Sequence, residues 1–298
     1  MSTEVTTLET PSSAPPRPPD PSEAAGELQI IEPSRGWPRL DARELWRYRE
    51  LLYFLVWRDI KIRYKQTALG AAWAVLQPLT TMVVFSLFFG RLAGLESRTG
   101  GIPYPIFVYA GLLPWTFVAN TVSSCGNSIL NEIHLITKVY FPRLVIPLST
   151  AGAGLVDLGV AFVVLLGMMA WYGVGISAQL LVLPLLLLGL ILAAAGVGLF
   201  FAALTVAYRD FRYVVPFAVQ LWMFVTPVIY PPAIVPRELR WLLLANPVAG
   251  TIEGFRAAIL GTPMPWLPVT VSLAIATSLF VGGVIYFRSV ERRFADII

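Results

Sequence analysis

The chain has 298 residues, of which 56% are hydrophobic and only 13% are charged, and its formal net charge is +4. Because soluble domains carry about 25% charged residues, this composition excludes a soluble globule and indicates a membrane domain. The single cysteine, Cys125, excludes an intrachain disulfide and a metal site built from several thiolates.

The first 36 residues are polar and contain seven prolines. Such a segment buries too little apolar surface to order itself, so we expect a disordered cytoplasmic tail over residues 1–36 and a membrane domain over residues 37–298. The tail lacks a basic start followed by an apolar run. We therefore expect no cleavable signal peptide.

Residues 41–59 are predicted to form an amphipathic helix. Its apolar side chains share one face: Leu45, Tyr48, Leu52, Leu55 and Val56. Charged residues occupy the opposite face, so we expect the helix to lie in the cytoplasmic interface with its apolar face toward the lipid. An ordinary surface helix is the alternative.

A helix that crosses a bilayer needs about 20 consecutive, mostly apolar residues. Six stretches have this character, and we predict membrane-spanning helices at residues 70–90, 105–130, 144–174, 180–207, 214–235 and 266–287. The expected fold is therefore an all-α integral membrane domain.

Residues 236–265, before the last span, contain two apolar pieces that are each too short to cross. Pro247, Gly250 and Gly261 interrupt them. Broken helices are tolerated at membrane depth only where protein or a watery cavity satisfies the backbone. We expect a re-entrant helical hairpin that enters the membrane and returns to the same side.

Lys and Arg residues flank the spans unevenly. Nine of them lie in residues 35–65, whereas the loop after the first span carries only Arg91 and Arg98. Cytoplasmic flanks retain positive charge, so both termini are predicted to be cytoplasmic. Because the basic residues lie beside spans rather than in a free patch, we do not expect a nucleic-acid partner.

Three charged residues fall in the apolar region. Asp157, inside the third span, is either a functional group or a carboxylate paired within the bundle. Glu253 and Arg256 are spaced i to i+3, so they can pair on one helix face, for function or merely for structure.

Aromatic residues gather around the second and fifth spans. The candidates for lining a pore that carries sugars are Trp115, Phe117, Trp222, Phe224 and Tyr230. Aromatic faces can stack against the apolar C–H faces of sugars. The alternative is core packing and an interfacial aromatic belt, which we favour for Tyr230.

Catalytic groups are scarce. The single histidine, His134, stands beside Glu132 in a loop, and no glycine-rich phosphate-binding loop occurs in the sequence. We expect no catalytic site, no metal and no bound cofactor, so any ATP-driven work must come from a partner.

Several short motifs occur in a fixed order: Asp59–Gly70, Ala72-Trp73, Gln77-Pro78, Gly111–Trp115, Leu135–Arg143, Tyr208–Asp210, Thr226–Val228, Asn246-Pro247 and Glu253–Arg256. Together, over residues 37–298, they resemble the ABC type-2 permeases with which bacteria export O-antigen, capsule, teichoic acid or related glycans.

This resemblance implies an inner-membrane half-transporter that forms a homodimer and binds two copies of a separate ATPase, which would hold ATP and Mg. It assigns coupling to the ATPase to Asn131, Leu135, Ile136, Lys138, Tyr140, Phe141, Pro142, Arg143, Arg209 and Asp210. It also assigns a periplasmic gate to the hairpin, with Asn246, Glu253 and Arg256. The dimer seam would involve the first and fifth spans and enclose a channel for a polyprenyl-linked glycan.

Two other classes of protein are the alternatives. A secondary transporter or channel would normally show inverted repeats or several intramembrane charges, and the sequence shows no internal repeat. A membrane glycosyl or acyl transferase would need converging acids or a histidine near one membrane face, and these are missing.

Overall fold

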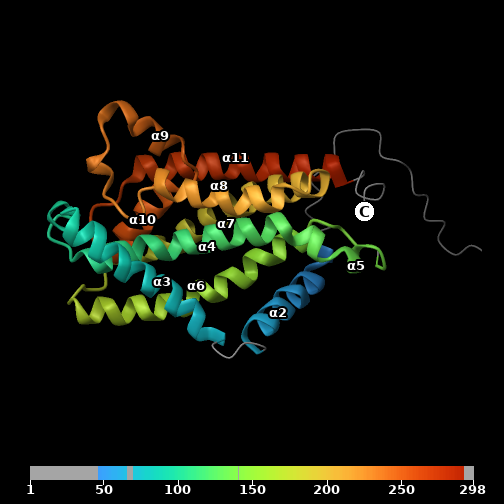
Figure 1. Ribbon diagram of the computed structural model, residues 1–298, viewed down its shortest axis with the longest axis horizontal. Helices are drawn as coiled ribbons and strands as arrows, with labels where there is room; N and C mark the ends of the chain where they lie inside the picture. Colours follow the sequence, from blue (N-terminus) through green and yellow to red (C-terminus); the bar gives the residue numbers. More distant parts are fainter. Residues whose placement is uncertain (1–45, 66–69, 140, 292–298) are drawn as a thin grey trace, which may run out of the picture. The chain divides into compact units, whose positions relative to one another are not determined.

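The computed structural model describes residues 46–65, 70–139 and 141–291, all within one compact unit, Pro38–Ile298. Within these ranges the regular structure is helical and includes no strand (Figure 1). The predicted tail over residues 1–36 lies outside the described residues.

Five helical segments of the described chain are long and apolar enough to cross a membrane: Ala72–Leu92, Tyr104–Asn131, Val145–Trp171, Ala178–Ala207 and Trp266–Glu291. The first combines α3 (Gly70–Phe85) with the π-helical turn η1 (Ser86–Leu92). The next two are α4 (Tyr104–Asn131) and α6 (Val145–Trp171). The last two are η3 (Ala178–Val182) continued by α7 (Leu183–Ala207), and α11 (Trp266–Glu291). They match the first four predicted spans and the sixth.

The predicted fifth span, 214–235, is wrong in its C-terminal half. Helix α8 (Phe211–Val225) has 15 residues and ends ahead of Pro227. Thr226 is extended, with φ −97° and ψ 136°, because a residue that precedes proline is driven out of the helical region. The chain then continues through turns and the short η4 (Pro232–Ile234) and η5 (Arg237–Leu239).

Short helices complete the described chain. The predicted hairpin region contains α9 (Arg240–Ala245) and α10 (Ala249–Leu260), and the segment between α4 and α6 contains α5 (Ile133–Ile136). A turn, η2 (Leu95–Arg98), follows η1. α9 stands out from the bundle, whereas α10 packs against α4, α7 and α11 (Figure 1).

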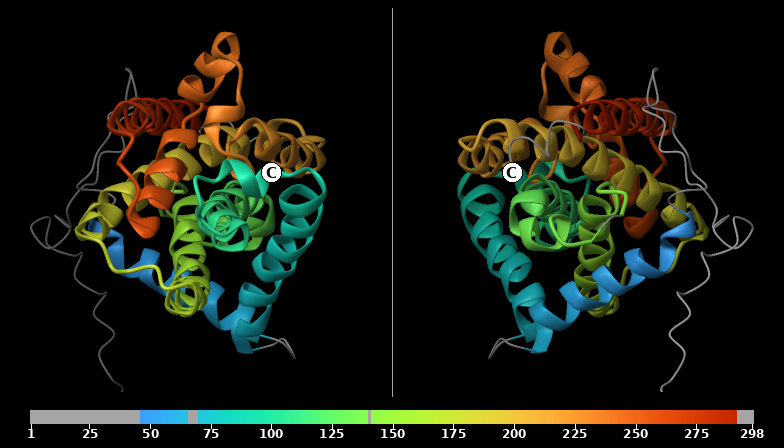
Figure 2. Two further views of the ribbon diagram at one scale, coloured as in Figure 1. Left: turned by 90° about the vertical axis from the view of Figure 1, so that its left-hand side faces the viewer. Right: turned by 90° about the vertical axis from the view of Figure 1, so that its right-hand side faces the viewer.

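α4 is the central helix. It packs against α3, α6, α7, α8 and α10, which surround it in both views of Figure 2. In the most apolar 18-residue stretch of α4, 78% of the residues are buried. The corresponding fraction for the segment formed by α3 and η1 is 11%. α3 and α8 flank α4 on one side of the bundle (Figure 2), and neither is well covered by protein.

Helix α2 (Arg49–Lys65) ends later than the predicted 41–59, of which residues 41–45 lie outside the described residues. Its apolar face packs against protein, mainly α6, rather than facing lipid: Leu55 is 2% exposed, and Tyr48 and Leu52 pack in the same cluster. The face left exposed is rich in aromatic residues: Trp46, Tyr53, Phe54 and Trp57. The expected orientation of the apolar face is therefore wrong.

Helices α7 and α11 approach each other closely enough for their backbones to touch. A Cβ atom added at Gly196 would lie 2.6 Å from the backbone nitrogen of Phe280, and one at Gly283 would lie 2.6 Å from the carbonyl oxygen of Gly196. Small residues permit such contacts between membrane helices, where close packing drives association.

We predict that Gly196→Ala destabilises the protein by about 1–3 kcal/mol, because the methyl group meets backbone atoms that cannot move aside. Thermal unfolding in detergent measures the effect. The control is Gly159→Ala on α6, where an added Cβ meets nothing within 4 Å. Equal melting temperatures for the two variants would contradict the backbone contact.

Candidate functional site

The segment between α4 and α6, residues 132–144, forms an elbow at one end of the bundle (Figure 1). Three of its apolar residues face inward: Leu135, Ile136 and Phe141 pack in the same cluster as Leu55 of α2, and Phe141 is 6% exposed. Its outward face carries exposed Lys138 and Val139.

The other residues predicted to couple to an ATPase lie around this elbow. Asn131 is exposed at the end of α4, and Pro142 and Arg143 are partly buried. Arg209 and Asp210 are exposed in the tight turn between α7 and α8, at the same end of the bundle (Figure 1). Tyr140 lies outside the described residues.

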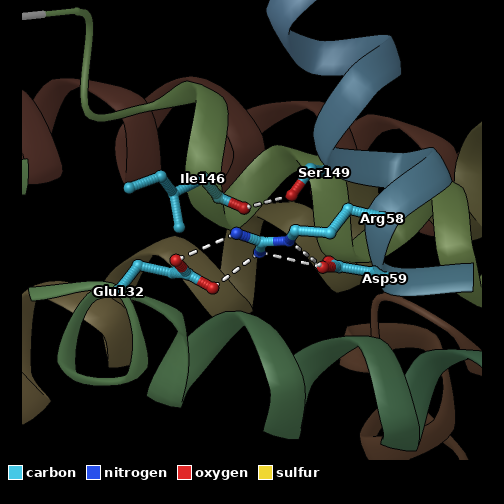
Figure 3. Close-up of polar contacts among 5 residues, drawn as sticks. All are labelled: Arg58, Asp59, Glu132, Ile146 and Ser149. Atoms are coloured by element: carbon cyan, nitrogen blue, oxygen red, sulfur yellow. Dashed lines mark hydrogen bonds and ion pairs between the residues drawn. The ribbon is translucent and has the colours of Figure 1, made fainter. Parts of the chain in front are cut away.

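Arg58 of α2 braces the elbow (Figure 3). Its guanidinium donates to both carboxylate oxygens of Glu132, at 3.0 and 2.6 Å, and to Asp59 Oδ1, at 3.1 and 2.9 Å. Burial opposes the charge, but the hydrogen bonds to Glu132 and Asp59 outweigh it and raise the pKa of Arg58. Bidentate pairs of this kind fix geometry as well as charge.

A second brace joins the elbow to the end of α11. The backbone N–H of Arg143 donates to Glu291 Oε1 at 3.1 Å, and its guanidinium donates to the backbone carbonyl of Glu291 at 2.9 Å. The elbow is thus held by α2 on one side and by α11 on the other.

Asp157, the charge inside the third predicted span, is paired with the C-terminal end of α2. Tyr64 Oη donates to Asp157 Oδ1 at 2.5 Å, and Arg63 forms an ion pair with the same carboxylate. Burial, together with the hydrogen bond to Asp157, raises the pKa of the Tyr64 phenol. Of the two interpretations made from sequence, the structure matches the paired carboxylate.

Trp115 and Trp222 are in contact, with ring centroids 5.6 Å apart and planes at 88°. Trp222 Nε1 donates to Asn246 Oδ1 at 3.1 Å, and Asn246 Nδ2 donates to Thr226 Oγ1 at 2.9 Å. Asn246 is only 5% exposed, and its backbone carbonyl accepts a hydrogen bond from Ser272 Oγ. This cluster ties the end of α8 to the turn between α9 and α10.

The other predicted aromatic residues lie elsewhere. Phe117 is 3% exposed, Phe224 is 52% exposed on α8, and Tyr230 donates its hydroxyl to the carbonyl of Phe224 at 3.2 Å. Within this single chain the five side chains therefore do not share one surface.

Arg256 is 4% exposed and binds backbone carbonyls. Its Nε donates to Phe107 at 3.2 Å, and its Nη2 donates to Pro227 at 3.0 Å and Val228 at 2.7 Å. The guanidinium also lies 3.9 Å from the centroid of the Phe107 ring. Gly111 makes room for it, since an added Cβ would lie 2.2 Å from Nη2.

Glu253 and Arg256, which their spacing allows to pair, do not form a direct ion pair. Among the described residues, the ion pairs within 4.0 Å do not include this one. The reason is geometric: the planar guanidinium reaches across to carbonyls that the break after α8 leaves without helical partners.

Sequence reasoning singled out none of Arg58, Arg63 and Tyr64 as a site residue, because they sit in a long basic stretch. The sequence signal that could have identified them was their position at the edge of the apolar face of the helix that contains them. Among the described residues, no three His, Cys, Asp or Glu side chains gather closely enough to hold a metal ion.

Comparisons with known proteins give consistent matches. The sequence profile described as ABC-2 type transporter matches residues 50–260. The chain is 30% identical over 259 residues to the O-antigen export system permease protein RfbA of Myxococcus xanthus, covering 86% of this chain and 98% of that protein.

Two further relatives extend this result. RfbA of Klebsiella pneumoniae, also described as an O-antigen export system permease protein, is 27% identical over 251 residues, covering 84% of this chain and 95% of the relative. The polysialic acid transport protein KpsM of Escherichia coli is 25% identical over 240 residues, covering 77% and 89%.

Arg256→Lys is predicted to lower the free energy of unfolding by about 2 kcal/mol, because an ammonium cannot reach all three carbonyls and leaves buried acceptors unpaired. Unfolding in detergent followed by circular dichroism measures this. Glu253→Gln is the control and should stay within about 0.5 kcal/mol of the natural chain. Similar losses of stability in both variants would indicate that Glu253 and Arg256 do form the ion pair that their spacing allows.

Proposed function

The chain belongs to the ABC-2 type transporter family, and from this premise we propose that it is the membrane permease of an ATP-driven polysaccharide exporter. The observation that carries the proposal is the alignment with an O-antigen export permease over 98% of that relative's length. The chain forms the passage, and it contains no phosphate-binding loop in its sequence, so a separate ABC ATPase supplies the energy.

We propose six spans, with α8 as the fifth, in a bacterial inner membrane. Both termini are cytoplasmic in this arrangement. The positive-inside rule supports it, because the elbow, the α7–α8 turn and the end of α11 meet at one end and carry Lys138, Arg143, Arg209, Arg212 and Arg288.

The α9–α10 hairpin is then periplasmic and re-entrant. Irregular backbone at membrane depth needs internal hydrogen-bond partners. Arg256 supplies them to residues 227 and 228, and Tyr104 Oη supplies one to Ile229 at 2.6 Å. Asn246, Arg256 and nearby Glu253 thus occupy the base of the proposed gate.

Two copies of the chain form the channel in this proposal. The supporting observation is the apolar surface that α3 and α8 leave exposed on the same side of α4 (Figure 2): Leu76, Val83, Val84, Phe217 and Leu221. A second copy would cover these side chains, and Phe224 would face the passage between the copies.

The cargo is proposed to be a lipid-linked cell-surface glycan carried on a polyprenyl lipid. The relatives are named for O-antigen export and polysialic acid transport, which are both polysaccharide cargoes. Two copies of the ATPase, with ATP and Mg, bind at the cytoplasmic end and move the elbow.

The test is reconstitution of the full chain, with the ATPase that copurifies from its native membrane, into proteoliposomes that contain the lipid-linked glycan. Translocation should require ATP and stop with vanadate. Translocation driven by a proton gradient without ATP would replace the proposal with a secondary transporter. Covalent extension or acylation of the glycan would support a transferase.

The outward face of the elbow is expected to contact the ATPase. The double substitution Lys138→Glu with Val139→Asp should weaken copurification of the ATPase by about tenfold, or about 1.4 kcal/mol, through repulsion and lost apolar contact. Arg98→Glu, an exposed charge reversal at the opposite end, is the control. Unchanged copurification would show that the ATPase contacts a part of the chain other than the elbow.

The Arg58–Glu132 pair is expected to transmit movement of the elbow to α2. Arg58→Glu and Glu132→Arg should each reduce the ATP hydrolysis that is coupled to glycan export, and the double reversal should recover part of the loss. The readout is glycan exported per ATP hydrolysed. Additive losses in the double variant would show that the pair does not act as a unit.

A further inference from the structure

A cavity of about 630 Å³ lies among α2, α3, α4 and α6. This volume falls in the range of small-molecule sites, which is about 300–1,000 Å³. The four helices are labelled in the lower half of Figure 1. None of the residues that line the cavity belongs to α8, so the cavity is distinct from the surface between α3 and α8.

A stripe of polar side chains on α4 faces this cavity. Thr116, Asn120, Ser123 and Ser124 line it. Their spacing of i, i+4, i+7 and i+8 puts them on one face of the helix. α4 is the most buried of the long helices, so a polar face on it needs an explanation.

The part of the chain that the structure describes leaves the hydrogen-bonding capacity of this stripe unused. No side chain of Thr116, Asn120, Ser123 or Ser124 bonds to another residue in the described ranges. One turn further along the same face, Asn127 Oδ1 is buried without a hydrogen-bond partner there. Polar groups at such depth are costly and mark paths for polar cargo.

The charges around the cavity cancel. The lining includes Arg63 and Asp157, which form an ion pair with each other. The cavity therefore offers no excess positive charge for a phosphate. Its remaining donors and acceptors are neutral amides and hydroxyls, including Gln77 of α3.

Aromatic rings complete the wall. Trp73 of α3, 58% exposed, and Phe117 of α4 both line the cavity. Neutral amides and hydroxyls beside an aromatic face match the two sides of a sugar ring, its hydroxyl edge and its apolar C–H face.

We propose that this cavity within the single chain is a subsite for a neutral sugar unit of the exported glycan, bound through the α4 stripe and stacked on Trp73. The inference rests on the proposed function and adds a binding site to it. Of the aromatic residues predicted from sequence to line a glycan path, Phe117 belongs to this site.

Thiol protection tests the proposal. Ser124→Cys is nearly isosteric, and the one natural cysteine, Cys125, is fully buried, so the unmodified chain gives the baseline. The full chain in lipid nanodiscs is treated with a small cationic methanethiosulfonate reagent. We expect Ser124→Cys to react about tenfold faster than the matched control Ser128→Cys, because buried thiols are inert. Ser128 lies on the same helix, is 5% exposed and bonds to the carbonyl of Cys125.

Three probes then identify the ligand class: octyl glucoside below its micelle concentration, octyl phosphate and octanol. Protection by the glucoside only, and its loss in Asn120→Leu and Trp73→Ala carrying the same cysteine, is the expected result. Equal or better protection by octyl phosphate would make the cavity an anion site, and protection by octanol would make it a pocket for lipid tails. Absence of labelling at Ser124→Cys would show that the cavity is closed. Each of these three results overturns the proposal.

Failure of the subsite and failure of the proposed function are separable. ATP-dependent glycan export by the unmodified chain is measured in parallel with labelling. Export without glucoside protection removes only the subsite. Glucoside protection without export keeps a sugar-binding cavity and removes the exporter.

Discussion

The arrangement of this protein depends on one requirement: backbone carbonyls released from a helix in apolar surroundings must find donors. The chain leaves its helix at Thr226, and the carbonyls that follow are bound by Arg256 of α10 and by Tyr104 of α4. Asn246 closes the same region by bonding to Thr226 and Trp222. α8, the α9–α10 turn and the central helix are therefore positioned by donors aimed at one broken stretch of backbone.

α2 links two regions that lie far apart in the sequence. Near its middle Arg58 grips the elbow through Glu132, and at its end Arg63 and Tyr64 hold Asp157 of α6. Its inner face is packed against the bundle, with Leu55 buried. Arg63, Tyr64 and Asp157 also line the cavity, so one continuous helix joins the elbow to the cavity wall.

Hydropathy and length predicted five of the long helices correctly, because the bilayer demands uninterrupted apolar runs. The same averaging failed at residues 226–235, which are mostly apolar but contain three prolines and are held by side chains distant in sequence. Averaging the hydropathy also concealed the spacing of Thr116, Asn120 and Ser123, because a few hydroxyl and amide groups barely change the mean hydropathy of a long apolar helix. Pairings over long distances, such as Arg58 with Glu132, carry no local signal. The local spacing of Glu253 and Arg256 allowed an ion pair, but the Arg256 guanidinium donates to backbone carbonyls instead.

The contact between Gly196 and Gly283 makes α7 and α11 the rigid pair of helices in the bundle. Where the backbones of α7 and α11 touch, there are no side chains between them that could change rotamer. The two helices can therefore slide or tilt past each other only if they first move apart. α3 and α8, by contrast, have exposed flanks and few protein neighbours to displace. A change of helix spacing within the bundle therefore costs less at α3 and α8 than between α7 and α11.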